Sequence, residues 1–409
     1  MPRIDDNIAG RRVQGKSRME TLDLKRKLTG LWKDTFHDSD EYIRLWFDKY
    51  YDPRWTEYEQ VGNEIVSMLF GVPYEFGGSE GKIRGLYLCG LATNAKYRGQ
   101  GLMSKLMDRI NDKAREAGFA FTFLIPSSER LIRFYSHHGY VKAFYRNQLN
   151  YTALHNFKNE YEFILEEQKD KVAELKRKLY ASLNGKEVEA STPVDKVNEI
   201  VDLLMNAEDA QTDMSVRHSR EDLHTAIKEN DVSGGKIYYT ENGQGKVTAV
   251  AFTTLIDRSR VDVERLFSSD DCSTYRLLDH IKHAEPDAGI RIYVRADESE
   301  WKNLAEVHGM ARVLDLSEIL KFQAAGLKDL KYSILVNEVP GQVERYDVRS
   351  GNVKHRSIEI DSEDFDQNKT VMSLKDMSSV LFRRPDTGVL ITEAFGMPSV
   401  GGYLNLMLD

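Results

Sequence analysis

Apolar residues recur at helical spacing through the first fifty residues of the chain. One set shares a helical face at Leu24, Leu28, Leu31 and Trp32, and a second set follows at Ile43, Trp46, Phe47 and Tyr50. The pattern breaks near residues 37–40, where Ser39 is a residue type that caps helix N-termini. We therefore predict two helices joined by a short turn, after a polar, flexible tail over residues 1–18.

Short apolar runs bounded by glycine and proline follow and alternate with helical patterns. Runs at 65–70, 86–92, 119–125 and 140–149 predict strands, with a turn at Gly62-Asn63 before the first. Helical patterns at 101–117 and 129–137 lie between the later strands, and Gly118 follows the first of them as a helix C-cap would. This order predicts an α/β fold with a mixed sheet over residues 19–150.

The same order recurs further along the chain. Runs at 237–240, 246–256, 261–267 and 290–294 predict strands, 273–283 predicts a helix, and a charged helix is expected at 160–183. Between 267 and 273 this copy carries Asp270 and Asp271 and no glycine, and the two carboxylates would repel an anion. We predict a degenerate second copy at 151–309. A third α/β region at 310–409 is predicted from strands at 332–336, 342–347 and 357–360 and helices at 373–382 and 385–394.

Composition narrows the class of protein without identifying it. The 409 residues are 41% hydrophobic and 30% charged, as expected for a soluble globular protein of two to three domains. We expect no secretion signal and no membrane span, and Cys89 and Cys272 form no disulfide framework, which together predict a cytoplasmic protein. The net charge of −8 argues against a nucleic-acid partner. We expect no metal. Whether translation starts at Met1 or Met19 stays open.

The most informative segment joins the second predicted strand to the next helix. It reads Lys96-Tyr97-Arg98-Gly99-Gln100-Gly101. The unpaired N–H groups at a helix start carry partial positive charge and bind anions such as a diphosphate. Gly99 and Gly101 let the backbone approach the anion, and Lys96 and Arg98 add cations. No Gly-Lys-Ser/Thr follows, which excludes a nucleotide-binding P-loop. Taken alone, the pattern also fits an ordinary helix start.

This loop resembles the diphosphate loop of the GNAT acetyltransferase superfamily, [Gln/Arg]-x-x-Gly-x-[Gly/Ala], with Lys96 where Gln or Arg is usual. The superfamily also has an aromatic-Tyr-x-x-x-Gly-aromatic segment, and residues 134–140 read Phe-Tyr-Ser-His-His-Gly-Tyr. Both motifs stand in the family's order and on fitting elements. The resemblance implies an acetyl-CoA-dependent N-acetyltransferase, with cofactor contacts at Leu91, Ala92, Thr93, Lys96, Arg98, Gly99, Gly101, Leu102 and Met103.

The resemblance also implies how these residues act. The backbone amides of residues 91–93 would pair with the pantetheine arm, and the Leu91 amide would polarise the thioester carbonyl. A neutral primary amine would attack directly in a ternary complex. Tyr135 matches the superfamily's usual general acid. The alternative is a helix tyrosine that only packs against the cofactor.

The layout of the whole chain resembles the enhanced intracellular survival (Eis) acetyltransferases. These have an active GNAT domain, a degenerate GNAT domain and a sterol-carrier-like α/β domain, here 19–150, 151–309 and 310–409. Met310, Arg312 and Asp315 match the Met-x-Arg-x-x-Asp pattern that commonly opens the last domain. Eis-like enzymes place their C-terminal carboxylate in the active site, which implies that role for Asp409, although the family more often ends in an aromatic residue. A tail packed on its own domain is the alternative.

The sequence identifies the binding site of the acceptor amine less specifically than it identifies the cofactor site. Phe36, Asp38, Trp46 and Phe47 resemble the region where Eis-like enzymes hold polyamines, and aromatic walls with carboxylates suit a cationic amine. Trp46 and Phe47 fit a hydrophobic core equally well. Aminoglycosides, polyamines and lysine side chains stay open as substrates, as does homo-oligomer formation. The alternative function is a lipid- or CoA-binding regulatory or scaffold protein without turnover.

Overall fold

The computed structural model describes residues 18–78, 81–151, 185–189, 192–211, 214–257, 259–296, 305–325, 327, 329–339, 342–359, 370–383 and 402–404. The tail at 1–17, the helices predicted at 160–183 and 385–394, and Asp409 lie outside these residues. In the described ranges, no helix combines the length and the hydropathy needed to cross a bilayer.

The first unit runs from α1 to β5 and alternates helices and strands in the predicted order. Its elements are α1 (Arg18–Phe36), α2 (Asp40–Lys49), η1 (Pro53–Trp55), β1 (Thr56–Val61), β2 (Glu64–Gly77), β3 (Lys82–Thr93), η2 (Ala95–Tyr97), α3 (Leu102–Glu116), β4 (Phe121–Leu124), α4 (Glu129–His137) and β5 (Val141–Tyr151). Ser39 caps α2 by accepting the N–H of Tyr42, as predicted. Gly62, with φ 58°, forms the predicted turn between β1 and β2.

Strand β2 is longer than the apolar run at 65–70 predicts. It continues through Gly71 and Pro73, both of which read as strand ends in the sequence. Strand β1 pairs with β2 only as far as Phe70, and β7 pairs with it only from Glu75 onward. Among the described strands, Pro73 therefore lies where β2 has no neighbour on that side, so a residue without an N–H donor is tolerated there.

The second unit runs from β6 to β11, and the third from β12 to β17. The second contains β6 (Gly185–Glu187), α6 (Val194–Asp209), β7 (Met214–Arg217), α7 (Arg220–Val232), β8 (Lys236–Glu241), β9 (Val247–Asp257), β10 (Arg260–Ser268), α8 (Asp271–Ala284) and β11 (Gly289–Arg295). The third contains β12 (Glu306–Val313), α9 (Leu316–Ala324), β13 (Lys331–Val339), β14 (Gln342–Arg349), β15 (Asn352–Ile358), β16 (Val371–Ser373), α10 (Leu374–Leu381) and β17 (Gly402–Tyr403). Helices α6, α7 and α9 are additions to the sequence prediction.

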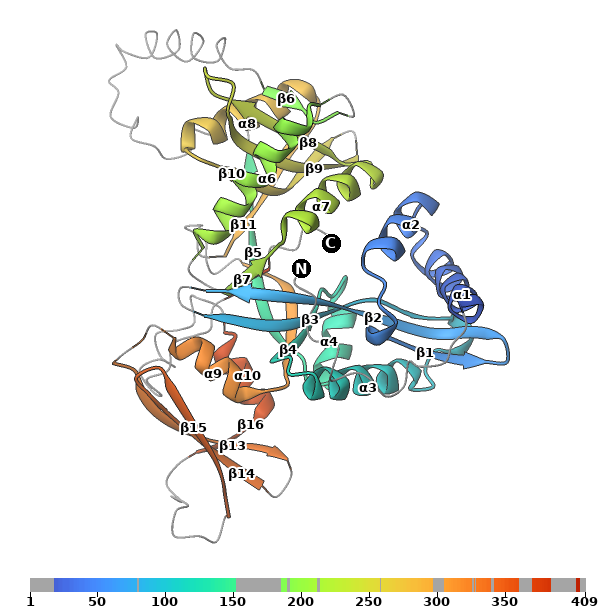
Figure 1. Cartoon of the computed structure of the whole chain (residues 1–409), viewed down its shortest axis with the longest axis vertical. Helices are drawn as coiled ribbons and strands as arrows, with labels where there is room; N and C mark the ends of the chain where they lie inside the picture. The colour runs from blue at the N-terminus through green and yellow to red at the C-terminus, as the bar shows by residue number, and fades with distance from the viewer. Residues whose placement is uncertain are drawn as a thin grey trace.

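One sheet unites the first two units (Figure 1). Among the described residues its 13 strands follow the order β17-β7-β2-β3-β4-β12-β5-β11-β10-β9-β8-β6, with β1 paired to β2 off this path. Strand β5 joins the two units because it pairs antiparallel with β11. Strand β12 lies between β4 and β5 and pairs antiparallel with both. The boundary placed at 309/310 thus falls inside a strand of the central sheet.

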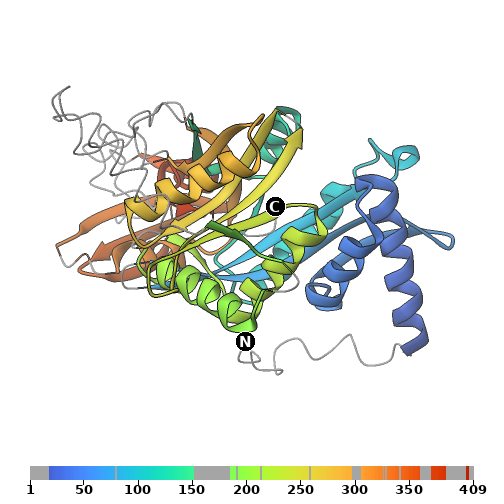
Figure 2. The same cartoon turned by 90° about the horizontal axis from the view of Figure 1, so that it is seen from above.

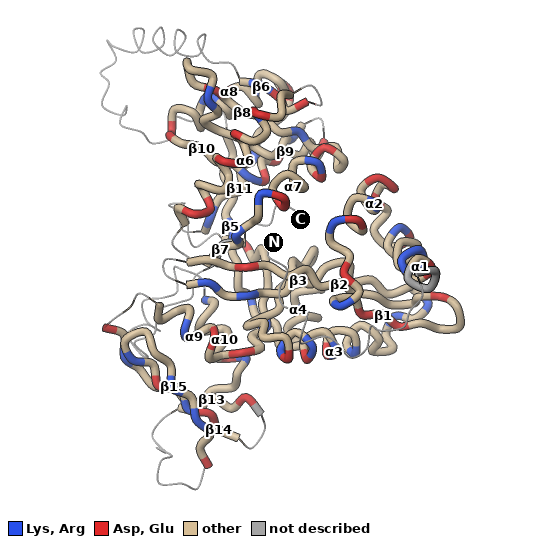
Figure 3. Tube along the Cα trace, viewed as in Figure 1, with Lys and Arg blue, Asp and Glu red and all other residues tan. Residues whose placement is uncertain are grey.

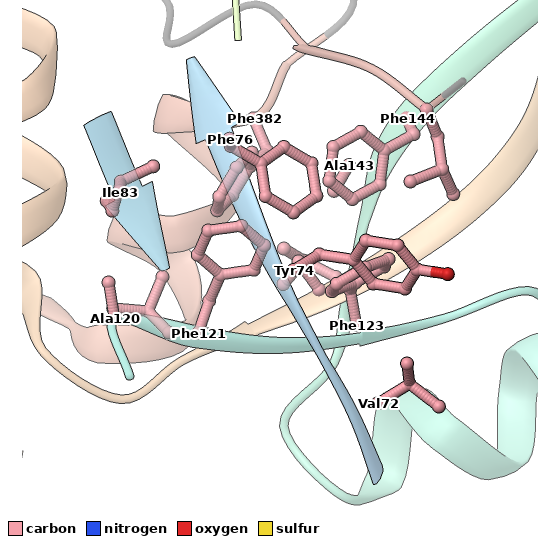
Figure 4. Packing of buried hydrophobic residues seen from close by; sticks show 14 of the residues in the cluster. Val72, Tyr74, Phe76, Ile83, Ala120, Phe121, Phe123, Ala143, Phe144 and Phe382 are labelled. Carbon is pink, nitrogen blue, oxygen red and sulfur yellow. The ribbon is translucent and has the colours of Figure 1, made fainter. Parts of the chain in front are cut away.

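A cluster of aromatic side chains fixes the third unit to this sheet (Figure 4). The rings of Phe76 and Phe121 lie 5.1 Å apart, and Phe382, directly after α10, lies 6.2 Å from Phe121 and from Phe144. All four side chains are almost completely buried. The third unit's own sheet has the order β15-β14-β13-β16. Seen from above, the third unit and helix α1 lie at opposite ends of the molecule (Figure 2).

Candidate active site

Strands β3 and β4 separate after three paired residues. Parallel pairing runs from Gly85–Phe121 to Tyr87–Phe123 and stops there, whereas β3 continues to Thr93. On its other side β3 stays paired with β2 up to Thr93. Within the described residues, 88–93 has no strand partner on the β4 side, so this edge is open to an extended ligand. Leu91, Ala92 and Thr93, which the sequence assigned to the pantetheine, all lie on it.

A bulge interrupts the pairing of β2 with β3 within this edge. The register shifts between the pairs Met68–Ala92 and Phe70–Cys89, and Gly90 has φ 59°. A Cβ on Gly90 would lie 2.7 Å from the rings of Phe70 and Trp32. Glycine is therefore required both by the backbone conformation and by the close approach of two aromatic side chains.

The loop after β3 is shaped by its own polar groups. The Asn94 side chain accepts the N–H of Lys96 at 3.1 Å, and Arg98 Nε donates to the carbonyl of Thr93 at 3.0 Å. Gly99 and Gly101 have φ 77° and 74°. No heavy atom lies within 4 Å of where their Cβ atoms would stand, so the left-handed backbone, and not lack of space, requires glycine.

Helix α3 begins without a side-chain cap. Gly101 occupies the N-cap position, and within the described part of the chain no side-chain cap bonds to the first-turn N–H groups, which include those of Leu102 and Met103. Lys96 and Arg98 are exposed beside them. Free N–H groups and two cations fit a diphosphate. In the second unit, helix α8 is capped by Asp270, whose carboxylate accepts the N–H of Ser273 at 2.9 Å. This carboxylate occupies the position at the start of α8 where a bound diphosphate would lie.

Tyr135 lies on α4 and is only 6% exposed. It belongs to an apolar cluster with Leu86 and Leu88 of β3 and Leu106 of α3, next to the place where β3 and β4 separate. Burial raises the pKa of Tyr135 above its ordinary value. The phenol therefore keeps its proton at neutral pH, as a proton donor must.

The C-terminal end of α4 is held by the third unit. Arg312 Nη1 donates to the carbonyl of His138 at 3.2 Å, and Lys375 Nζ donates to the carbonyl of Ser136 at 2.6 Å. Cations at a helix C-terminus stabilise it. His138 Nε2 and the Ser104 hydroxyl of α3 lie 3.1 Å apart. Arg312, one of the junction residues noted in the sequence, thus fixes the helix that carries Tyr135.

A cavity of about 120 Å³ opens on the other face of β3. Its walls come from α1, α2, β2 and β3 and consist of Trp32, Phe36, Asp38, Tyr42, Trp46, Tyr50, Val72, Tyr74, Tyr87, Cys89 and Gly90. Along β3, Tyr87 and Cys89 face this side, whereas Leu86 and Leu88 face α3. Both the cavity side and the α3 side of β3 adjoin the segment where β3 no longer pairs with β4. Of the described residues, no group of three or more His, Cys, Asp or Glu side chains is placed to hold a metal ion.

Three of the four residues assigned to the substrate line this cavity: Phe36, Asp38 and Trp46. Trp32 Nε1 donates to Asp38 Oδ2 at 2.8 Å and so orients the carboxylate. Phe47 is not among the lining residues. It is 3% exposed and packs against Trp32 at 5.8 Å between ring centroids, so its role is in the core.

Several lining residues were missed as site residues. Tyr42 and Tyr50 flank Trp46 at intervals of four, a spacing that places all three on one face of α2 and could have indicated a shared site. Burial raises the pKa of both tyrosines. Burial also raises the pKa of the Cys89 thiol, which disfavours the thiolate that a cysteine nucleophile needs.

The described part of the C-terminal segment reaches the centre of the molecule. Strand β17 pairs in parallel with β7, with Gly402 opposite Met214. Leu404 is fully buried, and its Cδ2 lies 3.0 Å from where a Cβ on Gly309 would stand. The segment therefore packs against the central sheet and not only on the third unit. Asp409 itself lies outside the described residues.

Comparisons with known proteins agree with this geometry. Residues 18–143 match the family model described as acetyltransferase (GNAT) domain. Three solved structures share the fold: a GCN5-related N-acetyltransferase from Anabaena variabilis (11% identity, 95% of this chain and 97% of that one, TM-score 0.64), one from Kribbella flavida (15%, 96% and 96%, 0.58), and Eis1 from Mycobacterium abscessus (11%, 90% and 88%, 0.56). No curated protein matches the sequence. The first unit is a GNAT acetyltransferase domain, the chain is an acyltransferase, and its fold resembles that of Eis1.

Proposed function

We propose that this enzyme transfers an acetyl group from acetyl-CoA to a primary amine by direct attack in a ternary complex. One observation supports the proposal most. Along β3, the cavity-lining residues Tyr87, Cys89 and Gly90 come first, and residues 91–93 of the open edge follow them. The anion-binding loop comes directly after the strand. A cofactor lying along this edge would place its thioester beside the cavity, as transfer between two bound substrates requires.

Each part of the site has a task in this proposal. The N–H groups of Leu102 and Met103, with Lys96 and Arg98, bind the diphosphate. When bound, acetyl-CoA supplies an activated thioester carbonyl. The Leu91 N–H donates a hydrogen bond to the carbonyl oxygen, where negative charge develops.

Two groups move protons. Tyr135, protonated because burial raises its pKa, donates to the departing thiolate. Asp409 accepts the proton of the substrate ammonium. The inward course of the described segment 402–404 supports this assignment, since it brings the C-terminal segment between β7 and the central core.

The acceptor in this proposal is a cationic amine, such as an aminoglycoside, a polyamine or a lysine side chain. Aromatic walls attract a cation through their ring faces, and Asp38 provides the opposite charge. The substrate amine must lose its proton before attack, which a carboxylate in the pocket assists.

We also propose that the third region is a sterol-carrier-like domain that acts as a scaffold. Its helices α9 and α10 pack tightly on the central sheet through Ile319, Leu320 and Met377, all fully buried. Arg312 and Lys375 hold the catalytic helix α4. These contacts favour a supporting role over lipid carriage.

Thiol release from acetyl-CoA, measured across aminoglycosides, polyamines and lysine peptides, tests the proposed function. We expect turnover with at least one cationic amine. Substituting Tyr135→Phe and deleting Asp409 should each lower kcat and leave the affinity for acetyl-CoA unchanged. Binding of acetyl-CoA without turnover of any amine would instead support a binding protein. Full activity in both variants would refute the assigned proton transfers.

A further inference from the structure

Helix α7 of the second unit packs against helix α2 of the acetyltransferase domain (Figure 1). At the rim of this contact, Lys49 of α2 and Glu221 of α7 form an ion pair at 3.2 Å. Acidic positions occur on both helices (Figure 3). Because α2 supplies Tyr42, Trp46 and Tyr50 to the cavity, α7 lies directly behind the acceptor site.

Glu229 is the carboxylate that α7 turns toward this wall. It is only 5% exposed, in a helix whose other buried residues are Leu223, Thr225, Ala226 and Ile227. The Tyr42 hydroxyl donates a hydrogen bond to it. Burial raises the pKa of Tyr42, and the negative charges of Glu229 and Asp38 raise it further. Burial raises the pKa of Tyr50 and Cys89, and the negative charge of Glu229 raises both further.

This hydrogen bond decides what Tyr42 offers to a ligand. A phenol has one proton and two acceptor lone pairs. Because the proton points to Glu229, the oxygen offers only lone pairs elsewhere, and these accept hydrogen bonds from an ammonium group. A carboxylate held in a low-dielectric wall adds attraction for a positive charge that solvent screens poorly.

We propose that Glu229, a residue of the degenerate second unit, completes the acceptor site through Tyr42 and selects amines that keep a second positive charge. The inference rests on the proposed function. The nitrogen that attacks must first lose its proton, so it does not enter the reaction as an ammonium paired with a carboxylate. A diamine carries a second ammonium that stays charged, and Asp38 and the Tyr42–Glu229 pair hold it.

A matched pair of acceptors, 1,4-diaminobutane and n-butylamine, tests the inference. They share the four-carbon chain and differ in the second amine. In the wild type we expect a higher kcat/KM for the diamine. Glu229→Gln keeps a hydrogen-bond acceptor for Tyr42 and removes the charge, so the diamine-to-monoamine ratio should fall about fivefold to tenfold through KM. The kcat/KM for n-butylamine should fall less than that for the diamine.

Glu221→Gln is the control, because Glu221 lies on the same helix with its side chain 74% exposed. It should keep the wild-type ratio. Glu229→Asp, which keeps the charge, should restore a large part of the preference, and this separates charge from packing if Glu229→Gln is unstable. An unchanged ratio in a folded Glu229→Gln variant, or an equal fall in Glu221→Gln, would overturn the inference.

Calorimetric binding of 1,4-diaminobutane separates this inference from the proposed function. If the wild type binds the diamine and acetyl-CoA but shows no turnover, the acetyltransferase proposal is contradicted. In that case, weaker diamine binding by Glu229→Gln still supports the role of Glu229. If the wild type acetylates both amines and Glu229→Gln binds the diamine as tightly as the wild type does, only the role of Glu229 is contradicted. Failure of the wild type to bind the diamine contradicts the role of Glu229, whereas the proposed function is tested separately by thiol release with the other amines.

Discussion

The start of helix α3 offers a test of the anion-binding loop with a control inside the same helix. Gly101 precedes α3 with φ 74°, and Gly118 follows it with φ 75°. Neither position has a heavy atom within 4 Å of a Cβ built on it. Gly101→Ala and Gly118→Ala therefore introduce the same backbone strain without a clash, one beside the proposed diphosphate and the other at the far end of a 15-residue helix.

The expected magnitudes follow from this strain. A left-handed conformation costs an L-residue about 1–2 kcal/mol, so Gly118→Ala should lose about that much free energy of unfolding, and Gly101→Ala should lose less because its loop relaxes. In Gly101→Ala the free loop relaxes toward negative φ, and binding must restore the left-handed form that aims the N–H groups. The dissociation constant for acetyl-CoA should then rise about fivefold to thirtyfold. Gly118 lies roughly 22 Å away along the helix, so its substitution should leave that constant unchanged.

Calorimetric titration with acetyl-CoA gives the affinities, and urea unfolding followed by circular dichroism gives the stabilities. The predicted outcome is that Gly101→Ala loses affinity and little stability, whereas Gly118→Ala loses stability and keeps its affinity. Should Gly118→Ala weaken binding as much as Gly101→Ala does, the effect belongs to the whole helix and not to its first turn. Wild-type affinity in Gly101→Ala would refute the diphosphate cradle.

Three further expectations concern the rest of the site. Because burial raises the pKa of Tyr135 above its ordinary value of 10, its phenol should stay protonated up to that pH. Deprotonation of Tyr135 should therefore cause no decrease of kcat below pH 10 in the wild type. Tyr135→Phe should lower kcat about 100-fold or more. Leu404→Ala should lower the free energy of unfolding by about 2–5 kcal/mol in urea, since Leu404 is fully buried, and a negligible loss would contradict its packing in the core. Arg312→Met removes a donor to the carbonyl of His138 and should lower kcat/KM for acetyl-CoA by about fivefold, which steady-state kinetics at saturating amine would reveal or exclude.

The parts of the fold that local rules govern were predicted well. Ser39, Gly62 and Gly118 occupy the cap and turn positions expected of them because each meets a requirement of its own backbone. Strand β2 was cut short because Gly71 and Pro73 read as strand ends. Whether a proline is tolerated depends on the neighbouring strand, and pairing partners are not local information.

The site shows the same division. The loop 96–101 and Tyr135 were assigned from the sequence because they belong to short motifs with fixed spacing, and their roles stay predictions. Phe47 could not be told from Trp46, since adjacent residues on one helix differ only in which face meets the cavity. The proposed role of Glu229 has no local sequence signal, because it depends on the packing of α7 on α2 across more than 180 residues of chain.

Strand β12 has a consequence for how the protein is made. It follows the first unit by more than 150 residues, yet it fills the place between β4 and β5. While the ribosome is still translating the second unit, β4 and β5 each present an unpaired edge, and such edges invite association with other chains. The acetyltransferase domain can reach its native form only after Val313 has left the exit tunnel. A gene fragment that ends at residue 151 should therefore yield insoluble protein.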